Sequence, residues 1–337
     1  MRWGKHSMSA QIIEHDATIK SDNGAPCMYL HYAAASFSGL KRANNEDSFL
    51  AKAPYFLVAD GMGGHTRGDA ASQAVVASFS EYANGIWATR EQMWQAFEKA
   101  RRDVENLARH DTRPPGSTLT GVALASENGV PCWHVINMGD SRTYLRRSNM
   151  FKQLTVDHSA QRLHPKSHVP RSVITRALGA GIKVKQFPDR WVIPVVDGDT
   201  LLICSDGLYT EVDDERINKV LQEKASPAEA VQELIEYAYE AGAHDNVTAL
   251  VLNVRSLSIP DGAVYVDSTI EDPDAQSLAV YAAYEKNFGE DTFGEGNLGN
   301  ENLSDDTLSD DTLGDDTADD VSAYMDASMS ELPEEKK

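Results

Sequence analysis

The sequence has few cysteines, no long apolar run and no excess of basic residues. Its three cysteines among 337 residues form no CxxC pair and show no metal-ligand spacing, which argues against a disulfide scaffold and predicts a reducing compartment. No stretch approaches the ~18 uninterrupted apolar residues of a membrane span. The first ten residues are polar and lack the apolar segment of a signal peptide. We therefore expect a cytoplasmic protein that does not bind a membrane.

Basic residues are outnumbered by acidic ones, 31 against 52, which gives a formal net charge of -21. This balance argues against nucleic acid as a partner, because a phosphate backbone is bound mainly through Lys and Arg. The imbalance is local, since 22 of the acidic residues but only 3 of the basic ones follow residue 258. The sequence therefore divides into a nearly neutral body and an acidic tail.

The body contains both strand-like and helix-like patterns. Strands are expected at 29–37, 55–59, 119–126, 132–138, 142–145, 191–195, 200–204 and 247–254. Helices are expected at 70–82, after a capping box of Thr89 and Gln92, and in a later pair whose second member has Ser226 as N-cap and Pro227 at its first position.

Turns and helix order indicate the fold class. Short turns at 127–129 and 197–199 each separate two strands, and strands joined in this way pair antiparallel. Two blocks of helices separated by a block of strands predict an α+β fold, with sheets packed together and helices outside. We expect a flexible segment at 1–28, one folded domain at 29–256 and the tail at 257–337.

The tail has an apolar residue at every fifth position. These residues are Phe288, Phe293, Leu298, Leu303, Leu308 and Leu313. The period fits neither a helix nor a strand, and high charge with sparse apolar content predicts disorder. Two alternatives stay open: the spaced residues anchor the tail to a basic partner, or the tail competes for a basic loop of the body or for divalent metal.

Five aspartates lie at the ends of expected strands: Asp47, Asp60, Asp140, Asp206 and Asp245. A single Asp-Gly after a strand is usually a plain turn. If the strand ends converge, however, five carboxylates share one small space, and their mutual repulsion requires a positive partner. Oxygen-only sites suit Mg2+ or Mn2+, whereas the scarcity of histidine in these motifs argues against zinc.

A carboxylate site with two such ions generates a hydroxide nucleophile at neutral pH and holds the oxygens of an in-line displacement at phosphorus. Gly61, Gly63 and Gly64 allow the backbone to approach a metal or a phosphate closely. A guanidinium is then needed for the substrate phosphate, and Arg42, five residues before Asp47, is the candidate.

Eight short motifs carry these residues. They are Arg42-x-x-Asn45-Glu46-Asp47, Asp60-Gly61-Met62-Gly63-Gly64-His65, Gly116-Ser117-Thr118, Gly139-Asp140-Ser141-Arg142, Asp157-His158-Ser159, Arg176-Ala177-Leu178-Gly179, Ser205-Asp206-Gly207-Leu208 and Asp245-Asn246-x-Thr248. In order and spacing they resemble the type 2C, metal-dependent protein serine/threonine phosphatases in their bacterial form. The resemblance runs from about residue 36 to residue 253.

The resemblance implies a four-layer α-β-β-α sandwich of two antiparallel sheets flanked by helices. It implies that Asp60 bridges two Mn2+ or Mg2+ ions, that the Gly61 carbonyl binds one of them, and that Asp206 and Asp245 bind the other. Asp47 contacts the ions directly or through water.

Further roles follow from the same resemblance. Asp140 with Asp206 would hold a weaker third ion, and Glu46 and Asn246 would support the site. Arg42 would bind the substrate phosphate while a hydroxide bridging the metals attacks phosphorus, with no phosphoenzyme.

The general acid is less well defined by the motifs. Eukaryotic relatives have histidine two residues after the bridging aspartate, where this chain has Met62. His65 is the nearest substitute, with an ordinary pKa that suits proton donation, although it equally fits a histidine that hydrogen-bonds the loop. His158 is expected to mark a structural turn into the next loop.

That loop, called the flap in the resembling enzymes, is short here, with 14 residues between Ser159 and Ile174. It is also basic, containing Arg162, Lys166 and Arg171. The simple interpretation is a solvated loop. The alternative is a shortened flap that recognises acidic surroundings of the phosphorylated residue.

We therefore predict a monomeric phosphatase acting on phosphoserine and phosphothreonine in proteins, and counteracting a cognate serine/threonine kinase. Two alternatives are a pseudophosphatase that serves as a binding module and a phosphatase of an anti-sigma-type regulator. An aryl phosphate assay with and without metal separates the pseudophosphatase from an enzyme.

Overall fold

The computed structural model describes residues 12–21, 24–63, 67–107, 114–163, 173–181 and 186–258. All of them belong to the first of two compact units, residues 1–288. His65, Lys166, Arg171 and residues 259–337 of the acidic tail, all subjects of predictions above, lie outside the described residues.

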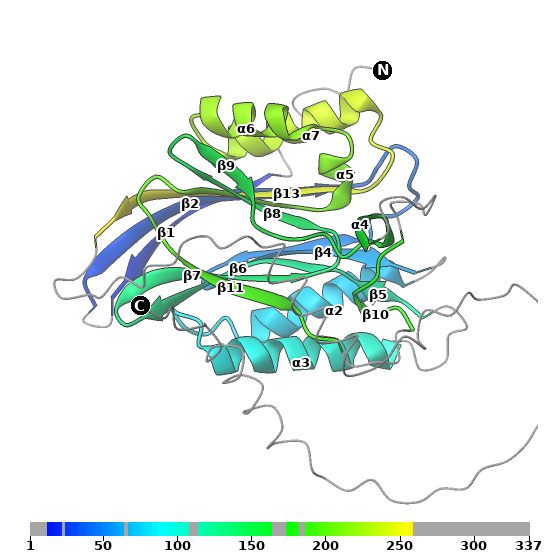
Figure 1. Ribbon diagram of the computed structural model, residues 1–337, viewed down its shortest axis with the longest axis horizontal. Coiled ribbons are helices and arrows are strands. Elements are labelled where there is room, and N and C mark those ends of the chain that lie inside the picture. The colour runs from blue at the N-terminus through cyan, green and yellow to red at the C-terminus, as the bar shows by residue number, and fades with distance from the viewer. Residues whose placement is uncertain are drawn as a thin grey trace, which may run out of the picture. The chain divides into compact units, whose positions relative to one another are not determined.

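Two antiparallel sheets pack face to face (Figure 1). The first has the strand order β1 (Ile13–Lys20), β2 (Pro26–Phe37), β13 (Val247–Leu257), β12 (Thr200–Cys204), β8 (Arg142–Arg147) and β9 (Met150–Gln153). The second has the order β10 (Leu178–Gly179), β5 (Gly116–Ser117), β4 (Tyr55–Met62), β6 (Leu119–Glu127), β7 (Val130–Met138) and β11 (Asp189–Pro194), with β3 (Asp47–Lys52) paired to β4.

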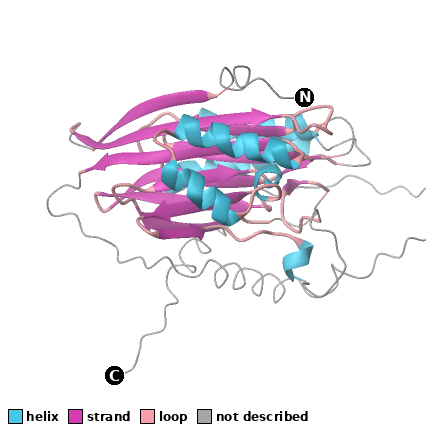
Figure 2. Cartoon of the chain, turned by 90° about the horizontal axis from the view of Figure 1, so that it is seen from above, coloured by secondary structure: helices cyan, strands magenta, loops and turns pink. Residues whose placement is uncertain are grey.

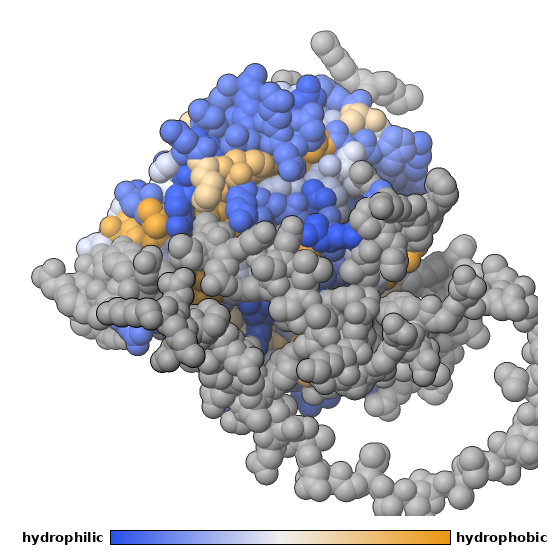
Figure 3. Space-filling model, in the orientation of Figure 1, coloured by the Kyte–Doolittle hydropathy of each residue, from blue (hydrophilic) through white to orange (hydrophobic). Residues whose placement is uncertain are grey.

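Helices cover the outer face of each sheet (Figures 1 and 2). The first sheet carries α5 (Asp206–Tyr209), α6 (Asp214–Glu223) and α7 (Pro227–Ala241), and the second carries α2 (Gly68–Glu81) and α3 (Arg90–Leu107). A short helix, α4 (Ala160–Leu163), follows β9. The outward side of α6 and α7 is largely hydrophilic, as expected for helices that bury one side only (Figure 3). The predicted four-layer sandwich is confirmed.

Alternation along the strands explains why this chain forms four layers. In β4, Tyr55 and Leu57 face the helices α2 and α3, whereas Phe56 and Val58 face the other sheet. All four are completely buried. Successive side chains of a strand point to opposite faces, so a run of apolar residues serves two cores at once. Burial of each such side chain contributes about 1.5–3 kcal/mol.

Local signals are satisfied as the sequence predicts. Thr89 and Gln92 form a reciprocal capping box, with backbone-to-side-chain distances of 3.1 Å in both directions. Ser226 accepts the Glu229 amide proton at the start of α7. The 127–129 turn closes the β6–β7 hairpin, with Asn128 and Gly129 both at positive φ.

Two predictions are wrong. Residues 13–20, placed in a flexible segment, form the edge strand β1 and pair with β2. Ile13, Ala17 and Ile19 face the core between the sheets, but the polar residues among them obscured the alternation. The folded part thus begins before residue 29.

The second concerns the strands on either side of residues 197–199. They do not pair with each other, because β11 pairs with β7 in one sheet whereas β12 pairs with β13 and β8 in the other. The turn carries the chain from one sheet to the other.

Candidate active site

The five predicted aspartates lie at one edge of the sandwich, where strands of both sheets begin or end. Asp47 opens β3 and is paired in register with Asp60 of β4. Asp140 occupies the corner between β7 and β8, Asp206 opens α5 directly after β12, and Asp245 comes two residues before β13. Antiparallel pairing brings these positions together although they are far apart in sequence.

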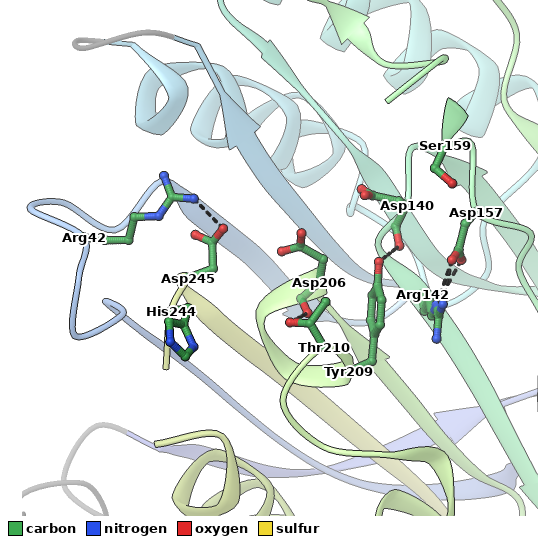
Figure 4. A pocket seen from close by; sticks show the side chains of 10 residues that line it. All are labelled: Arg42, Asp140, Arg142, Asp157, Ser159, Asp206, Tyr209, Thr210, His244 and Asp245. Atoms are coloured by element: carbon green, nitrogen blue, oxygen red, sulfur yellow. Dashed lines mark hydrogen bonds and ion pairs between the residues drawn. The ribbon is translucent and has the colours of Figure 1, made fainter. Parts of the chain in front are cut away.

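A cleft of about 380 Å³ lies at this edge. Its lining includes Arg42, Asp140, Asp206 and Asp245. The guanidinium predicted to bind phosphate and three of the five predicted carboxylates therefore share one space (Figure 4). The Arg42 guanidinium lies 2.5 Å from the Asp245 carboxylate. Asp206 lies between Asp245 and Asp140 in this view.

Burial and mutual repulsion raise the pKa values of these carboxyl groups. The pKa of Asp47 rises to about 7, that of Asp140 to about 7 and that of Asp206 to about 6. The pKa of Asp60 rises well above its ordinary value, because of burial and then the charges of Asp47, Asp206 and the other aspartates. The groups therefore behave as one electrostatic cluster that favours either protons or cations.

The surroundings of Asp47 differ from those of the others. One oxygen of this buried carboxylate accepts hydrogen bonds from the hydroxyls of Ser205 and Thr248, both at 2.7 Å. These bonds connect β3 to β12 and β13 across the two sheets. They fix Asp47 firmly beside Asp60.

Loop contacts place Arg42 beside Asp245. The side chain of Asn246 accepts the Glu46 amide proton at 2.9 Å and donates to the Asn44 carbonyl at 3.0 Å. These two bonds join the loop before β3 to the turn before β13. The predicted supporting residues Glu46 and Asn246 thus link the segments that carry Arg42 and Asp245.

Gly61 allows the backbone at the end of β4 to approach its neighbours closely. A Cβ atom there would lie 2.0 Å from the Gly68 carbonyl oxygen and 2.6 Å from that of Glu46. Any side chain would therefore displace the start of α2 or the loop before β3. This packing explains the Asp-Gly pair without requiring a turn.

The donor set fits hard divalent cations. Among the described residues, no three Asp, Glu, His or Cys side chains converge as they stand into a metal-holding group. However, one buried oxygen of Asp140 and one of Asp206 have no hydrogen-bond partner. Partnerless buried carboxylate oxygens beside other carboxylates are unfavourable alone and suit Mg2+ or Mn2+.

The structure shows cleft residues to which the motifs assigned no role. Tyr209, Thr210 and His244 also line the cleft. Arg142 makes a two-pronged ion pair with Asp157 and stacks over the Tyr209 ring, 3.6 Å from its centroid. Tyr209 directly follows the motif that contains Asp206, which was the one available sequence signal.

The loop after Ser159 is closed at its base. Ser159 bridges Ile174, and Thr175 donates its amide proton to the His158 carbonyl at 2.9 Å. His158 is buried, which agrees with its predicted structural role. Arg162 is exposed on α4.

The fold and the cleft together define a class: sandwiches of two antiparallel sheets with carboxylates of both sheets at one edge, as in metal-dependent phosphatases. The sequence model of the protein phosphatase 2C family matches residues 41–248. This chain belongs to that family.

Relatives and solved structures agree with this placement. The serine/threonine protein phosphatase PstP of Mycobacterium tuberculosis is 37% identical over 242 residues, covering 67% of this chain and 45% of its own length. The serine/threonine phosphatase stp of Listeria innocua is 31% identical, with 66% and 95% covered. This chain thus spans about half of the mycobacterial relative.

A crystal structure of the PstP catalytic domain in complex with two manganese ions superposes with a TM-score of 0.59 and 35% identity. The match covers 67% of this chain and 99% of that chain.

No helix among the described residues is long and apolar enough to cross a membrane.

Proposed function

We propose that this protein hydrolyses phosphoserine and phosphothreonine in phosphorylated protein substrates. The observation that carries the proposal is the cleft in which the Arg42 guanidinium faces the carboxylates of Asp245, Asp206 and Asp140. A guanidinium binds phosphate oxygens in pairs. The adjacent carboxylates hold the cations that phosphoryl transfer to water requires.

The ion-binding roles are assigned as follows. Asp60, Gly61, Asp206 and Asp245 would hold two Mn2+ or Mg2+ ions, an interpretation that the two manganese ions of the PstP catalytic domain support. Asp47 would contact these ions directly or through water, and Asp140 with Asp206 would hold a weaker third ion. Such ions supply charge neutralisation and water activation.

The protein's own groups then perform three tasks. Arg42 orients the substrate phosphate and releases Asp245 when it does so. Asn246 keeps the Arg42 loop attached to the Asp245 turn. The buried hydroxyls of Ser205 and Thr248 hold Asp47 in place.

Cellular context is also part of the proposal. A serine/threonine kinase supplies the phosphorylated substrates, and the phosphatase acts as a monomer. The three buried cysteine thiols favour a reducing compartment such as the cytoplasm.

The test is hydrolysis of phosphoserine and phosphothreonine peptides in Mn2+, in Mg2+ and in EDTA, with an aryl phosphate assayed in parallel. We expect release of phosphate that depends on the metal for both substrate types. Metal binding without turnover of either substrate would instead indicate a pseudophosphatase.

A further inference from the structure

The loop that follows Ser159 is attached to the rest of the protein through a base made of residues 158–160 and 173–176. The two arms of this loop base are hydrogen-bonded, since Ala160 donates its amide proton to the Val173 carbonyl at 2.8 Å. His158 opens the first arm and Arg176 ends the second. Both side chains turn inward and meet at Asp189 on β11.

His158 is joined to the corner that carries Asp140 by two reciprocal bonds. The Gly139 amide donates to His158 Nδ1 at 3.0 Å, and the His158 amide donates to the Gly139 carbonyl at 2.9 Å. Because Nδ1 accepts from Gly139, the remaining ring proton is assigned to Nε2, which lies 3.0 Å from Asp189 Oδ2 and 2.8 Å from the Arg176 Nη1 atom.

Asp189 connects this ring to the second arm. Its other oxygen accepts from Arg176 at 2.8 Å, and Arg176 also donates to the Phe187 carbonyl at 2.5 Å. The side chains of Asp189 and His158 are 2% and 4% exposed. Burial and the Arg176 charge lower the pKa of His158, so the ring stays neutral. Burial alone would raise the pKa of Asp189, but the bonds from His158 and Arg176 lower it by more. The net pKa lies below the ordinary value, so the carboxylate stays ionised.

The corner at Gly139 has little freedom of its own. Gly139 has φ +115°, and a Cβ atom there would lie 2.5 Å from the Thr118 Cγ2 atom. The carbonyl of Asp140 accepts from the Tyr209 hydroxyl at 2.9 Å (Figure 4). The corner is thus held by His158 at the Gly139 backbone and by Tyr209 at the Asp140 carbonyl, while the Asp140 carboxylate faces the cleft with one partnerless oxygen.

We propose that His158 is a positioning residue: the buried His158–Asp189–Arg176 network ties both arms of the loop base to Asp140 and sets the place of this carboxylate in the cleft. The inference rests on the proposed function, since it assumes that Asp140 serves the reaction. Misplacement of a reacting or charge-bearing group by about 1 Å costs on the order of 10²-fold in rate. A partial loss of support is expected to cost roughly tenfold.

Two substitutions cut the connection at different bonds. His158→Asn keeps an oxygen near the position of Nδ1, where it accepts from Gly139, but does not reach Asp189. His158→Gln reaches Asp189 with its amide but withdraws the acceptor from Gly139. We expect both variants to lower kcat on a phosphopeptide about tenfold while KM changes less than threefold.

The matched control is another buried ion pair. Asp199 binds Arg147 through two bonds of 2.7 and 2.8 Å, and its side chain is fully buried. Arg147 lies at the far end of β8, five residues and about 17 Å along the strand from Arg142, the strand residue nearest to Asp140 in sequence. Asp189→Asn and Asp199→Asn should both lower the melting temperature, but only Asp189→Asn should lower kcat about tenfold.

A double-variant comparison separates positioning from plain stability. If His158 acts through Asp140, then adding His158→Gln to Asp140→Asn should produce no further loss of kcat, because interacting residues are not additive. The inference would be overturned if the kcat of the double variant fell by the product of the two single-variant losses. It would also be overturned if Asp199→Asn lowered kcat as much as Asp189→Asn does.

Binding of Mn2+ alone, measured by titration calorimetry without substrate, gives a readout that does not need turnover. His158→Gln should weaken the same binding step that Asp140→Asn weakens, and Asp199→Asn should leave it unchanged. An unaltered Mn2+ isotherm in His158→Gln refutes the inference. A wild-type protein that binds Mn2+ but releases no phosphate refutes only the proposed function, and the calorimetric comparison still decides this inference.

Discussion

The Arg42 guanidinium lies 2.5 Å from the carboxylate of Asp245, although 203 residues separate them in the chain. Their side chains are 47% and 33% exposed, so the pair sits at the mouth of the cleft rather than inside the fold. An exposed pair of this kind contributes little to stability. The pair matters for position instead, because Asp245 holds the Arg42 guanidinium where the substrate phosphate is expected to bind.

Replacement of Arg42 tests this position. We expect Arg42→Ala to lower kcat/KM for a phosphopeptide roughly 10²-fold, mostly through KM, because the phosphate loses its charged donors. Arg42→Lys should recover only part of the loss, since an ammonium lacks the planar fork. Lys41→Ala removes a neighbouring exposed cation and is the control. A similar loss in Lys41→Ala would mean that general surface charge, not Arg42, attracts the substrate.

Replacement of Asp206 should separate activity from stability. Asp206→Asn removes a charge that the proposed ions need, so turnover in Mn2+ should fall by at least about 10²-fold. The same change relieves repulsion within the cluster, so the melting temperature in EDTA should rise by roughly 2–4 °C. Glu215→Gln, an exposed acid of α6, should change neither quantity. A lower melting temperature for Asp206→Asn in EDTA would contradict the repulsion argument.

The raised pKa values predict how metal-free stability depends on pH. Asp47 and Asp140 have pKa values of about 7 in the folded protein and ordinary values near 3.8 when unfolded. The folded state therefore binds more protons across this window, and its stability falls as pH rises through 7. We expect the melting temperature in EDTA to drop between about pH 5 and 7.5 and to level off above about pH 8.

Addition of Mn2+ should oppose this drop, and more strongly at pH 8.5, where fewer protons compete for the carboxylates. Asp140→Asn should flatten the pH dependence measured in EDTA. Differential scanning calorimetry in matched buffers makes the comparison. A melting temperature in EDTA that increases over the same range would show that these carboxyl groups are not the titrating ones.

The short basic loop leads to a prediction about substrate size. Arg162 is exposed on α4, whereas Arg171 lies outside the described residues. If both recognise acidic surroundings of the phosphorylated residue, the double change to Ala should raise KM for phosphoproteins several-fold and leave a small aryl phosphate unaffected. Kinetics on the two substrates decide the matter, and equal effects would count against recognition by the loop.

Much of this molecule follows from local sequence. The uninterrupted apolar run from Tyr55 to Val58 indicates a strand buried on both faces, and this pattern needs no knowledge of the partners. The capping box of Thr89 and Gln92 is likewise complete within four residues. The aspartates are recognisable because each lies at or next to the start or the end of a largely apolar strand. Such signals depend on neighbours in the chain, so the sequence displays them directly.

Tertiary structure decided what depends on distant partners. Ile13 and Ile19 form an edge strand only because β2 supplies backbone bonds to it. The turn before Thr200 uses the same residue types as a hairpin, yet it connects two sheets, since β11 pairs with β7 and β12 pairs with β13 and β8. The links from Arg42 to Asp245 and from His158 to Asp189 also join remote segments. Their geometry is set by how the two sheets stack, and stacking is determined by the packing of the whole core rather than by any local stretch of sequence.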